Sequence, residues 1–185
     1  IYNDGSGCWK NYQGDELNIV GNYEVTFKLP PVPKDGMYEL RMGVSANSQR
    51  GMCQVYWGTN KNALAPAGMP VDMRMGGQYW YMSGNRKPSI VGWEADIRGD
   101  DDFNATVDKN MRNNWYMKAP NYFYWYGQST SARHRESNLR RILVREQMKA
   151  DETYYINFRS LLDDYHTEFF LDYIEFCPKE VYDNP

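Results

Sequence analysis

Alternation of apolar and polar residues is the feature that most restricts how this chain can fold. Every second residue is apolar in residues 22–29 (NYEVTFKL) and again in residues 37–44 (MYELRMGV). A period of two is typical of a β-strand that buries one face and exposes the other. The segment between the two stretches, PPVPKDG, holds three prolines and cannot continue a hydrogen-bonded ladder. We therefore expect two strands joined by a turn.

Further stretches of the same kind follow along the chain. We expect strands at residues 52–57, 69–75, 139–147, 153–161 and 168–177. The segments between them are polar or rich in glycine and proline, so we expect residues 58–68 to be a loop and residues 178–185 to be a tail. About seven short strands separated by turns are typical of a β-sandwich. The sequence therefore predicts an all-β fold.

The middle of the chain, residues 76–138, lacks this alternation and is expected to be an insertion into the β fold. Large apolar residues recur there at every fourth position: Phe103, Val107, Met111 and Trp115. This spacing gives one apolar stripe on a helix, so we expect one helix near Asn104–Trp115. Acidic side chains are favoured at a helix start, which makes Asp101 or Asp102 the expected N-cap.

Length and charge limit the domain count and the partners. A chain of 185 residues fits one domain, 1–185. The net charge of −3 argues against a nucleic-acid partner, because nucleic-acid binders present a basic surface. No apolar run approaches the ~20 residues that span a bilayer, so no membrane span is expected in this chain. The abrupt start at Ile1 predicts a fragment of a longer protein, with another domain of the same polypeptide beside it.

The cysteine and histidine content argues against a metal centre. The three cysteines, Cys8, Cys53 and Cys177, allow one intrachain disulfide at most, and no C-x-x-C pair is present. With only two histidines in the chain, a structural zinc site is not expected. Free, partly buried thiols are the expected state, and a Cys8–Cys177 bridge between the terminal strands is the alternative.

The acidic, serine and glycine residues form none of the common catalytic patterns. Glycoside hydrolysis needs two carboxylates facing one site, and the spacing of the acidic residues singles out no pair. The sequence contains no G-x-S-x-G elbow and no glycine-rich phosphate loop. The acidic run at residues 96–102 is expected to be an exposed loop that caps the helix, rather than a calcium loop. We therefore expect a non-catalytic protein.

Three segments at the two ends of the chain resemble a known fold. GNYEVTFKLPPVPKDGMYELRMGV (residues 21–44) is similar to the opening strands of galactose-binding-like jelly rolls. NLRRILVREQMKADETYYINFRSL (residues 138–161) resembles a late strand pair of that fold, and EFFLDYIEFCP (residues 168–178) resembles its terminal strand. The whole set is most similar to the C-terminal domains of fasciclin-containing cell-surface proteins of Bacteroidetes. The resemblance covers about half of the chain.

This resemblance implies an antiparallel jelly-roll β-sandwich. The helix-containing insertion at about residues 76–138 departs from the compact carbohydrate-binding modules of this fold. The resemblance also implies an accessory module outside the cytoplasm, at the cell surface or in the periplasm, beside a fasciclin domain. In related sugar-binding jelly rolls the matching Asp of the last strand helps to hold a structural calcium ion, which makes Asp172 a candidate calcium ligand. The alternative is that Asp172 pairs with an arginine or a backbone amide, since a carboxylate on a buried face needs a partner.

Carbohydrate is the ligand suggested by the resemblance together with the aromatic residues. The chain holds 16 Tyr and 6 Trp, and two aromatic clusters, QYWYMSGNRK and NYFYWYGQ, lie in the insertion. Sugar C–H faces pack on flat rings, so we expect Trp80 and Trp125 to be stacking platforms. Flanking contacts are expected from Tyr81, Arg86 and Tyr124. The alternatives are that these rings anchor the insertion to the β fold, and that the module serves protein–protein adhesion or a structural role.

Two further groups of residues have a more ordinary interpretation. Tyr38, Tyr154 and Tyr173 alternate with apolar residues and are expected to lie in the core. Basic residues gather around the start of a late strand: Arg133, His134, Arg135, Arg140, Arg141 and Arg145. They could form a patch for an anionic ligand, but the neighbouring Glu136 and Glu146 favour a solvated face.

Overall fold

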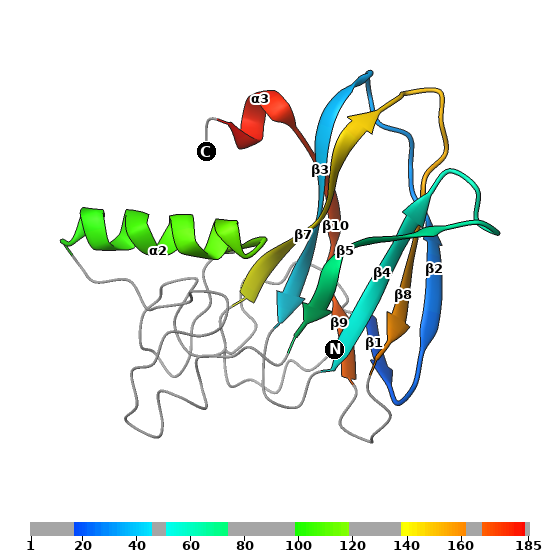
Figure 1. Ribbon diagram of the computed structural model, residues 1–185, viewed down its shortest axis with the longest axis horizontal. Helices are drawn as coiled ribbons and strands as arrows, with labels where there is room; N and C mark the ends of the chain where they lie inside the picture. The colour runs from blue at the N-terminus through cyan, green and yellow to red at the C-terminus, as the bar shows by residue number, and fades with distance from the viewer. Residues whose placement is uncertain (1–16, 46–50, 74–98, 119–137, 162–167, 184–185) are drawn as a thin grey trace, which may run out of the picture.

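The computed structural model describes residues 17–45, 51–73, 99–118, 138–161 and 168–183 (Figure 1). Ten strands and two helices lie within these ranges. Every strand pairing among the described residues is antiparallel. The prediction of a β-rich, antiparallel fold is therefore confirmed.

One sheet contains four strands in the order β10–β3–β7–β6, and is here called the β3–β7 sheet. Its strands are β10 (Ile174–Pro178), β3 (Gly36–Ser45), β7 (Asn138–Met148) and β6 (Tyr116–Lys118). The predicted apolar face of β3 is buried in the core: Tyr38, Leu40, Met42 and Val44. Because successive side chains of a strand point to opposite faces, Glu39 and Arg41 lie on the outer face of this sheet.

The second sheet has the order β2–β8–β4–β5. Its strands are β2 (Glu24–Lys28), β8 (Tyr155–Ser160), β4 (Met52–Gly58) and β5 (Ala65–Asp72). β5 begins at Ala65 rather than at Met69, so the predicted loop at residues 58–68 is wrong in its last part. β5 is an edge strand, and most of its residues are exposed on both faces. It therefore lacks the alternation that marks the other strands.

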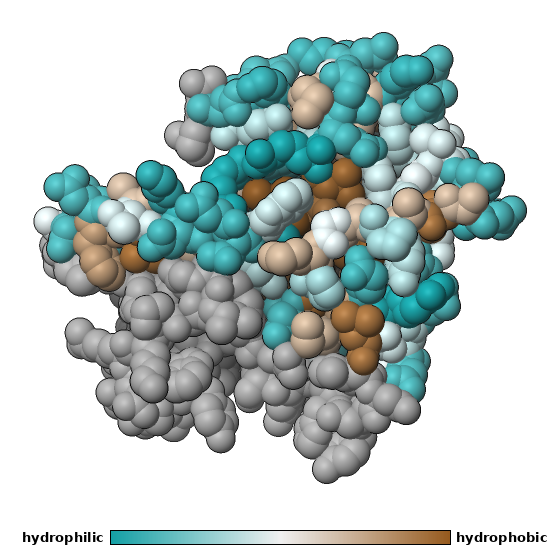
Figure 2. Space-filling view, viewed as in Figure 1, coloured by the Kyte–Doolittle hydropathy of each residue, from teal (hydrophilic) through white to brown (hydrophobic). Residues whose placement is uncertain are grey.

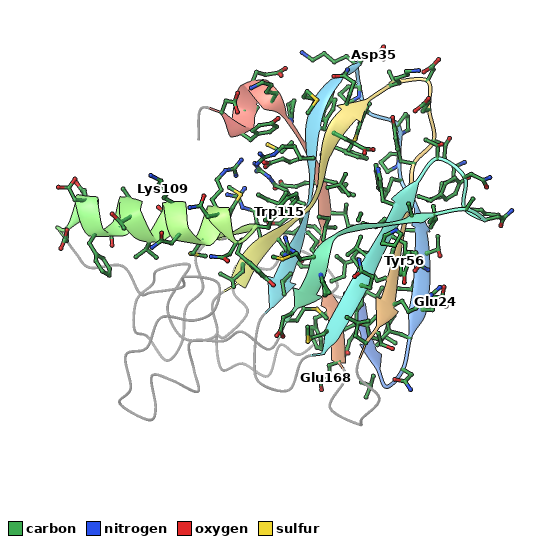
Figure 3. All side chains as sticks on the ribbon, in the orientation of Figure 1. Glu24, Asp35, Tyr56, Lys109, Trp115 and Glu168 are labelled. Atoms are coloured by element: carbon green, nitrogen blue, oxygen red, sulfur yellow. The ribbon has the colours of Figure 1, made fainter. Side chains whose placement is uncertain are left out.

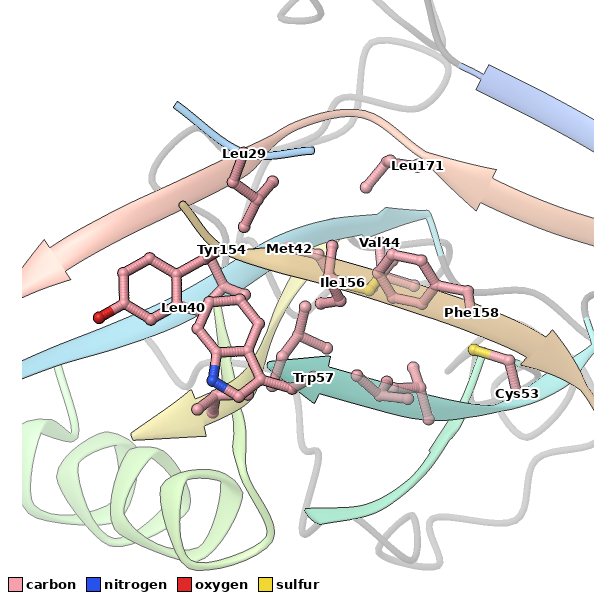
Figure 4. Close-up of a cluster of buried hydrophobic side chains, with 14 of the residues drawn as sticks. Leu29, Leu40, Met42, Val44, Cys53, Trp57, Tyr154, Ile156, Phe158 and Leu171 are labelled. Carbon is pink, nitrogen blue, oxygen red and sulfur yellow. The ribbon is translucent and has the colours of Figure 1, made fainter. Parts of the chain in front are cut away.

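The two sheets face each other and enclose the main core (Figure 4). Leu40 of the β3–β7 sheet and Phe158 of the second sheet both lie in this core with no exposed surface. The rings of Trp57 and Tyr154 stack, with 5.0 Å between their centroids and 6° between their planes. Tyr38 and Tyr154 are buried, as predicted, whereas the prediction of a core position is wrong for Tyr173, which is half-buried. Burial of apolar surface is the main force that stabilises two sheets packed in this way.

A further pair of strands brings the two ends of the described chain together. The pair consists of β1 (Leu17–Val20) and β9 (Glu168–Leu171). β9 and β10 are separated by Asp172 and Tyr173, so the predicted single strand at residues 168–177 is wrong. The Gly43 N–H donates to the Tyr173 carbonyl at 2.9 Å, and the half-buried Tyr173 ring lies against Gly43. The Tyr173 ring thus occupies the space that a side chain at position 43 would need.

The helix predicted in the insertion is α2 (Asp101–Asn113). Its N-cap is Asp100, whose carboxylate accepts a hydrogen bond of 3.0 Å from the Phe103 N–H. The expected cap at Asp101 or Asp102 is therefore wrong, and both residues belong to the first turn instead. The apolar stripe packs into a second, smaller core formed by Val107, Met111, Tyr116 and Leu139, with Phe103 beside it.

A short helix, α3 (Lys179–Tyr182), replaces the predicted tail and packs against β3 and β10. In Figure 1 both helices lie on the side of the β3–β7 sheet that faces away from the second sheet. None of the helices in the described ranges is long and apolar enough to cross a membrane. The helices thus lie over the outer face of the β3–β7 sheet.

Candidate binding site

A cavity of about 770 Å³ lies on the outer side of the β3–β7 sheet, and is here called the α2–β7 cavity. It is lined by Asp108, Lys109, Arg112 and Asn113 from α2, and by Trp115, Met117, Arg140, Ile142 and Arg145 from β6, β7 and the turn before β6. Figure 3 labels Lys109 on α2 and Trp115 at its C-terminal end, beside β7. The residues of α2 visible in Figure 2 are mostly hydrophilic. Of the described lining side chains, four are cationic and one is a carboxylate, so this part of the lining is basic.

Glu39 of β3 organises the wall beside this cavity. Its position in the alternating strand places it on the outer face, yet its side chain has no exposed surface. A carboxylate removed from water is stable only where cations and hydrogen-bond donors surround it. Glu39 therefore depends on partners supplied by the elements packed around it.

Three arginines provide these partners, and we call Glu39, Arg41, Arg112 and Arg145 the Glu39 cluster. Oε2 of Glu39 accepts hydrogen bonds from Nε and Nη2 of Arg41 at 2.9 and 2.6 Å. Oε1 accepts from Nη2 of Arg112 at 2.7 Å, and from Nε and Nη2 of Arg145 at 3.0 and 2.5 Å. Arg41 and Arg145 belong to the sheet, whereas Arg112 belongs to α2. One buried carboxylate thus ties the helix to the sheet.

A second carboxylate continues this arrangement along the sheet. Glu175 of β10 lies opposite Arg41 in the strand register. Its Oε1 lies 3.6 Å from Nη1 of Arg41 and 3.5 Å from Nη1 of Arg140. Four arginines therefore share the two carboxylates of Glu39 and Glu175. Among the described residues, the outer face of the sheet carries more arginines than carboxylates where it meets the cavity.

Tyr182 of α3 covers the Glu39 cluster. Its buried ring lies 5.8 Å from the guanidinium carbon of Arg112 and 5.4 Å from that of Arg145. A guanidinium group at this distance is attracted by the quadrupole of the ring. Nη1 of Arg112 also donates to Sδ of Met117 at 3.0 Å. Both arginines are held from several sides, which reduces the side-chain entropy that binding a ligand would cost.

Trp115, at the end of α2, has a strained backbone. Its φ is 66°, the one positive value among the described residues other than glycine. This left-handed conformation costs a residue with a Cβ about 1–2 kcal/mol and persists where surrounding contacts impose it. The Trp115 carbonyl accepts from the Ile142 N–H at 2.8 Å and from Nη1 of Arg141 at 3.2 Å. These bonds from β7 fix the turn that holds the half-buried Trp115 side chain at the cavity.

The basic cluster predicted near β7 divides into two parts. Arg141 is only 2% exposed, and its Nη2 donates to the Met69 carbonyl of β5 at 3.1 Å. Its guanidinium carbon lies 4.9 Å from the ring centroid of Tyr116, and burial lowers the pKa of Arg141 below its usual range. The predicted solvated face is therefore wrong for Arg141, which joins β5 to β6 and β7. Arg140 and Arg145 line the cavity instead.

The residues predicted to bind sugar are Trp80, Tyr81, Arg86, Tyr124 and Trp125, and all five lie outside the described residues. The same holds for Arg133, His134 and Arg135. Their roles therefore stay predictions. The described part of the insertion, α2 and β6, forms the α2–β7 cavity against β7.

Asp172 lies between β9 and β10 and is half-buried, and this burial raises the pKa of its carboxyl above the ordinary value. Calcium prefers six to eight oxygen ligands, several of them carboxylates. Within the described ranges, no group of three His, Cys, Asp or Glu side chains could hold a metal ion. The described side chains around Asp172 thus do not make up a calcium site, and calcium binding there stays a prediction from resemblance.

Two of the cysteines are described, and both Cys53 and Cys177 are free and buried. The alternative of a Cys8–Cys177 bridge is therefore wrong, and the expectation of free thiols is confirmed for these two residues. Burial raises the pKa of Cys53 to about 12. A thiol with so high a pKa is a poor nucleophile at neutral pH, so Cys53 serves as a core residue.

Sequence reasoning alone does not single out Glu39 or Arg112 as parts of a site. In an alternating strand, Glu39 resembles any residue of a solvated face. The available signal is charge complementarity between the two long strands, because the polar face of β3 carries an acid and β7 carries several arginines. Only the packing of α2 onto this face turns that complementarity into a buried cluster.

Comparison with known proteins adds no relative. No protein-family model, no curated protein and no solved structure matches the chain. The resemblance to galactose-binding-like and fasciclin-associated domains therefore stays a prediction, carried by residues 21–44, 138–161 and 168–178.

Proposed function

We propose that the chain is a non-catalytic carbohydrate-binding module with a jelly-roll fold, and that its ligand site is the α2–β7 cavity. The observation that carries this proposal is the cavity itself, which combines Trp115 and Asn113 with guanidinium groups fixed by Glu39. Its volume lies within the range of roughly 300–1,000 Å³ typical of small-molecule sites.

The jelly-roll part of the proposal is supported by the nesting of the strand pairs. A jelly roll is a long antiparallel hairpin rolled up on itself, so its outermost strands pair with each other and its innermost strands form the hairpin end. Here β1 pairs with β9, β2 with β8, β3 with β7 and β4 with β5. β10 continues beyond β9 along β3, and β6 is added at the edge beside β7.

The binding role is supported by the chemistry of the lining. Arginine and lysine side chains donate hydrogen bonds and hold a fixed charge at neutral pH, so they bind oxygen atoms and do not accept protons. Trp115 offers an apolar ring for a sugar C–H face, while Asn113 offers both a donor and an acceptor for hydroxyl groups. This set of groups suits recognition of a polar, oxygen-rich ring.

The cellular context is proposed from the resemblance at the two ends of the chain. The module acts outside the cytoplasm, at the cell surface or in the periplasm, attached to a neighbouring domain such as a fasciclin domain. In this role it holds a glycan close to the rest of the polypeptide, so affinity in the modest range is sufficient.

A glycan array with the purified chain tests the function. We expect binding to a restricted set of glycans, and loss of that binding in Trp115→Gly, which removes the ring and leaves a residue that favours positive φ. Tyr56→Ala is the matched control, because Tyr56 lies in β4 of the second sheet, away from the cavity lining. Absence of binding to every glycan on the array argues against carbohydrate binding and in favour of protein–protein adhesion.

Two further measurements separate this site and this role from the alternatives. Loss of binding in Trp80→Ala and Trp125→Ala, with Trp115→Gly unaffected, would place the site in the aromatic segments of the insertion instead. Hydrolysis of a bound glycan, abolished by a single carboxylate substitution, would overturn the non-catalytic role.

A further inference from the structure

The described lining of the α2–β7 cavity carries more positive than negative charge. The whole chain has a net charge of −3. Around the cavity, by contrast, four arginines share the two carboxylates of Glu39 and Glu175. Lys109 adds another cation and, among the described residues, forms no ion pair. Asp108 is the one carboxylate among the described lining residues.

An excess of buried or half-buried cations is costly without a compensating anion. Like charges a few ångströms apart repel, and the repulsion is stronger where neighbouring side chains exclude water. Replacing part of the cluster by apolar residues would remove this cost, and a balanced cluster of two arginines and two carboxylates would avoid it. Among the described residues, three guanidinium groups meet the single carboxylate of Glu39, and an added anion would lower their mutual repulsion.

The groups that would receive the anion are already in position. Nε and Nη2 of Arg145 are bound to Glu39, which leaves Nη1 without a hydrogen bond among the described residues. Arg112 is fixed by Glu39 and by the Tyr182 ring. Fixed guanidinium groups match the flat, two-oxygen geometry of a carboxylate and also bind sulfate.

We propose that the ligand of the α2–β7 cavity is an acidic saccharide whose carboxylate or sulfate group lies against Arg112, Arg140 and Arg145, with Lys109 strengthening the positive field. The sugar part of this inference rests on the proposed function. The charge part rests on the cluster alone, because an anion of any source would complete it. Trp115 lies at the same cavity and can contact the ring that bears the charge.

Matched ligands test the charge. The full chain is titrated calorimetrically with a trigalacturonate, with the same trisaccharide methyl-esterified at its carboxyl groups, and with a sulfated disaccharide. We expect the trigalacturonate or the sulfated sugar to bind at least about tenfold more tightly than the ester, and the affinity to fall as salt rises from 50 to 500 mM. Preference for the first identifies the carboxylate source, and preference for the second identifies the sulfate source.

Matched variants test the site. Lys109→Gln removes one charge from a residue with no described ion pair, so the fold is retained, and we expect several-fold weaker binding of the acidic sugar. Lys61→Gln is the control, because Lys61 is exposed in the turn between β4 and β5 and does not line the cavity. Equal loss in both variants, or no loss in Lys109→Gln, would overturn the site.

The outcomes for the two proposals are distinguishable. If the ester binds as tightly as the acid, the charge inference is overturned and the glycan function stands. If inorganic sulfate binds in a manner that depends on Lys109 and no saccharide binds, the charge inference stands and the glycan function is overturned. If neither sugars nor sulfate bind, both are overturned.

Discussion

Nη2 of Arg112 donates a hydrogen bond of 2.7 Å to Oε1 of Glu39, and this bond joins α2 to the outer face of β3. The two residues are 73 positions apart in the sequence. Because Glu39 is fully buried while Arg112 reaches the cavity, the same pair supports both the fold and the candidate site. Substitutions can separate the contribution of this pair to stability from its contribution to the candidate site.

Removing the charge of Glu39 is expected to destabilise the chain strongly. Glu39→Gln leaves three guanidinium groups around a neutral amide, and breaking a buried ion pair on one side typically costs about 3–5 kcal/mol. Urea unfolding measures the change in the free energy of unfolding. Glu24→Gln is the control, because the exposed Glu24 carboxylate pairs with Arg159 at 2.7 Å and should matter far less. Equal effects in the two variants would contradict the role given to the Glu39 cluster.

A side chain at position 43 is expected to destabilise the chain where β3 meets the residues between β9 and β10. A Cβ there would lie 2.5 Å from Cε1 of Tyr173, so Gly43→Ala must displace the ring. We expect a loss of about 1–3 kcal/mol, the usual cost of overpacking, measured by thermal or urea unfolding. Combining it with Tyr173→Ala tests the cause, because the collision disappears and the double variant should lose less than the two single losses added together.

Of two substitutions at Trp115, the glycine variant is expected to be more stable than the alanine variant, the reverse of the order in a helix. Both Trp115→Ala and Trp115→Gly remove the ring, so only the Cβ distinguishes them. At a φ of 66°, glycine is unstrained and alanine is not, so the glycine variant should be more stable by about 1 kcal/mol. In the exposed middle of α2, Lys109→Ala should instead be more stable than Lys109→Gly. The same order at both positions would show that Trp115 is not strained.

Asp172 is expected to make stability depend on pH. Burial raises the pKa of this carboxyl in the folded state, so the folded chain binds the proton more tightly than the unfolded chain. The free energy of unfolding therefore falls as pH rises above the ordinary pKa of an aspartate. Asp172→Asn should be more stable than the parent at pH 7 in a chelator, and the difference should vanish near pH 3.

Calcium added to the same two proteins tests the prediction from resemblance. If Asp172 is a calcium ligand, calcium will raise the melting temperature of the parent chain and leave that of Asp172→Asn unchanged. Equal melting curves with and without calcium would remove Asp172 from any metal site.

The strands that alternation predicted are those with one face in the core. β3 is the clearest case, because Leu40 and Met42 face the core while Glu39 and Arg41 face outward. β5 was misplaced because an edge strand with both faces largely exposed has no reason to alternate. β1 and β6 were not predicted, since each has only three or four residues and carries too short a pattern.

The candidate site was the harder part to predict. The helix stripe and the late arginines were both visible in the sequence, but nothing local indicates that Arg112 and Arg145 meet on one carboxylate of β3. Such a meeting depends on how α2 packs on a sheet face, which is a non-local property. Arg141 illustrates the same limit, because its neighbours Arg140 and Ile142 line the cavity while Arg141 itself is buried.

The nesting of the strand pairs has a consequence for how the chain acquires its structure. β4 and β5 pair across a short turn, whereas β1, β2 and β3 must wait for β9, β8 and β7 from the last third of the chain. Long loops must close before these strands can pair, and closing them costs conformational entropy. Folding is therefore expected to take milliseconds to seconds rather than microseconds. Of the described strands, only β7 and β10 pair with β3, and neither exists until residue 138 has been synthesised. β1, β2 and β3 are therefore exposed to wrong pairings until the last third of the chain has been synthesised.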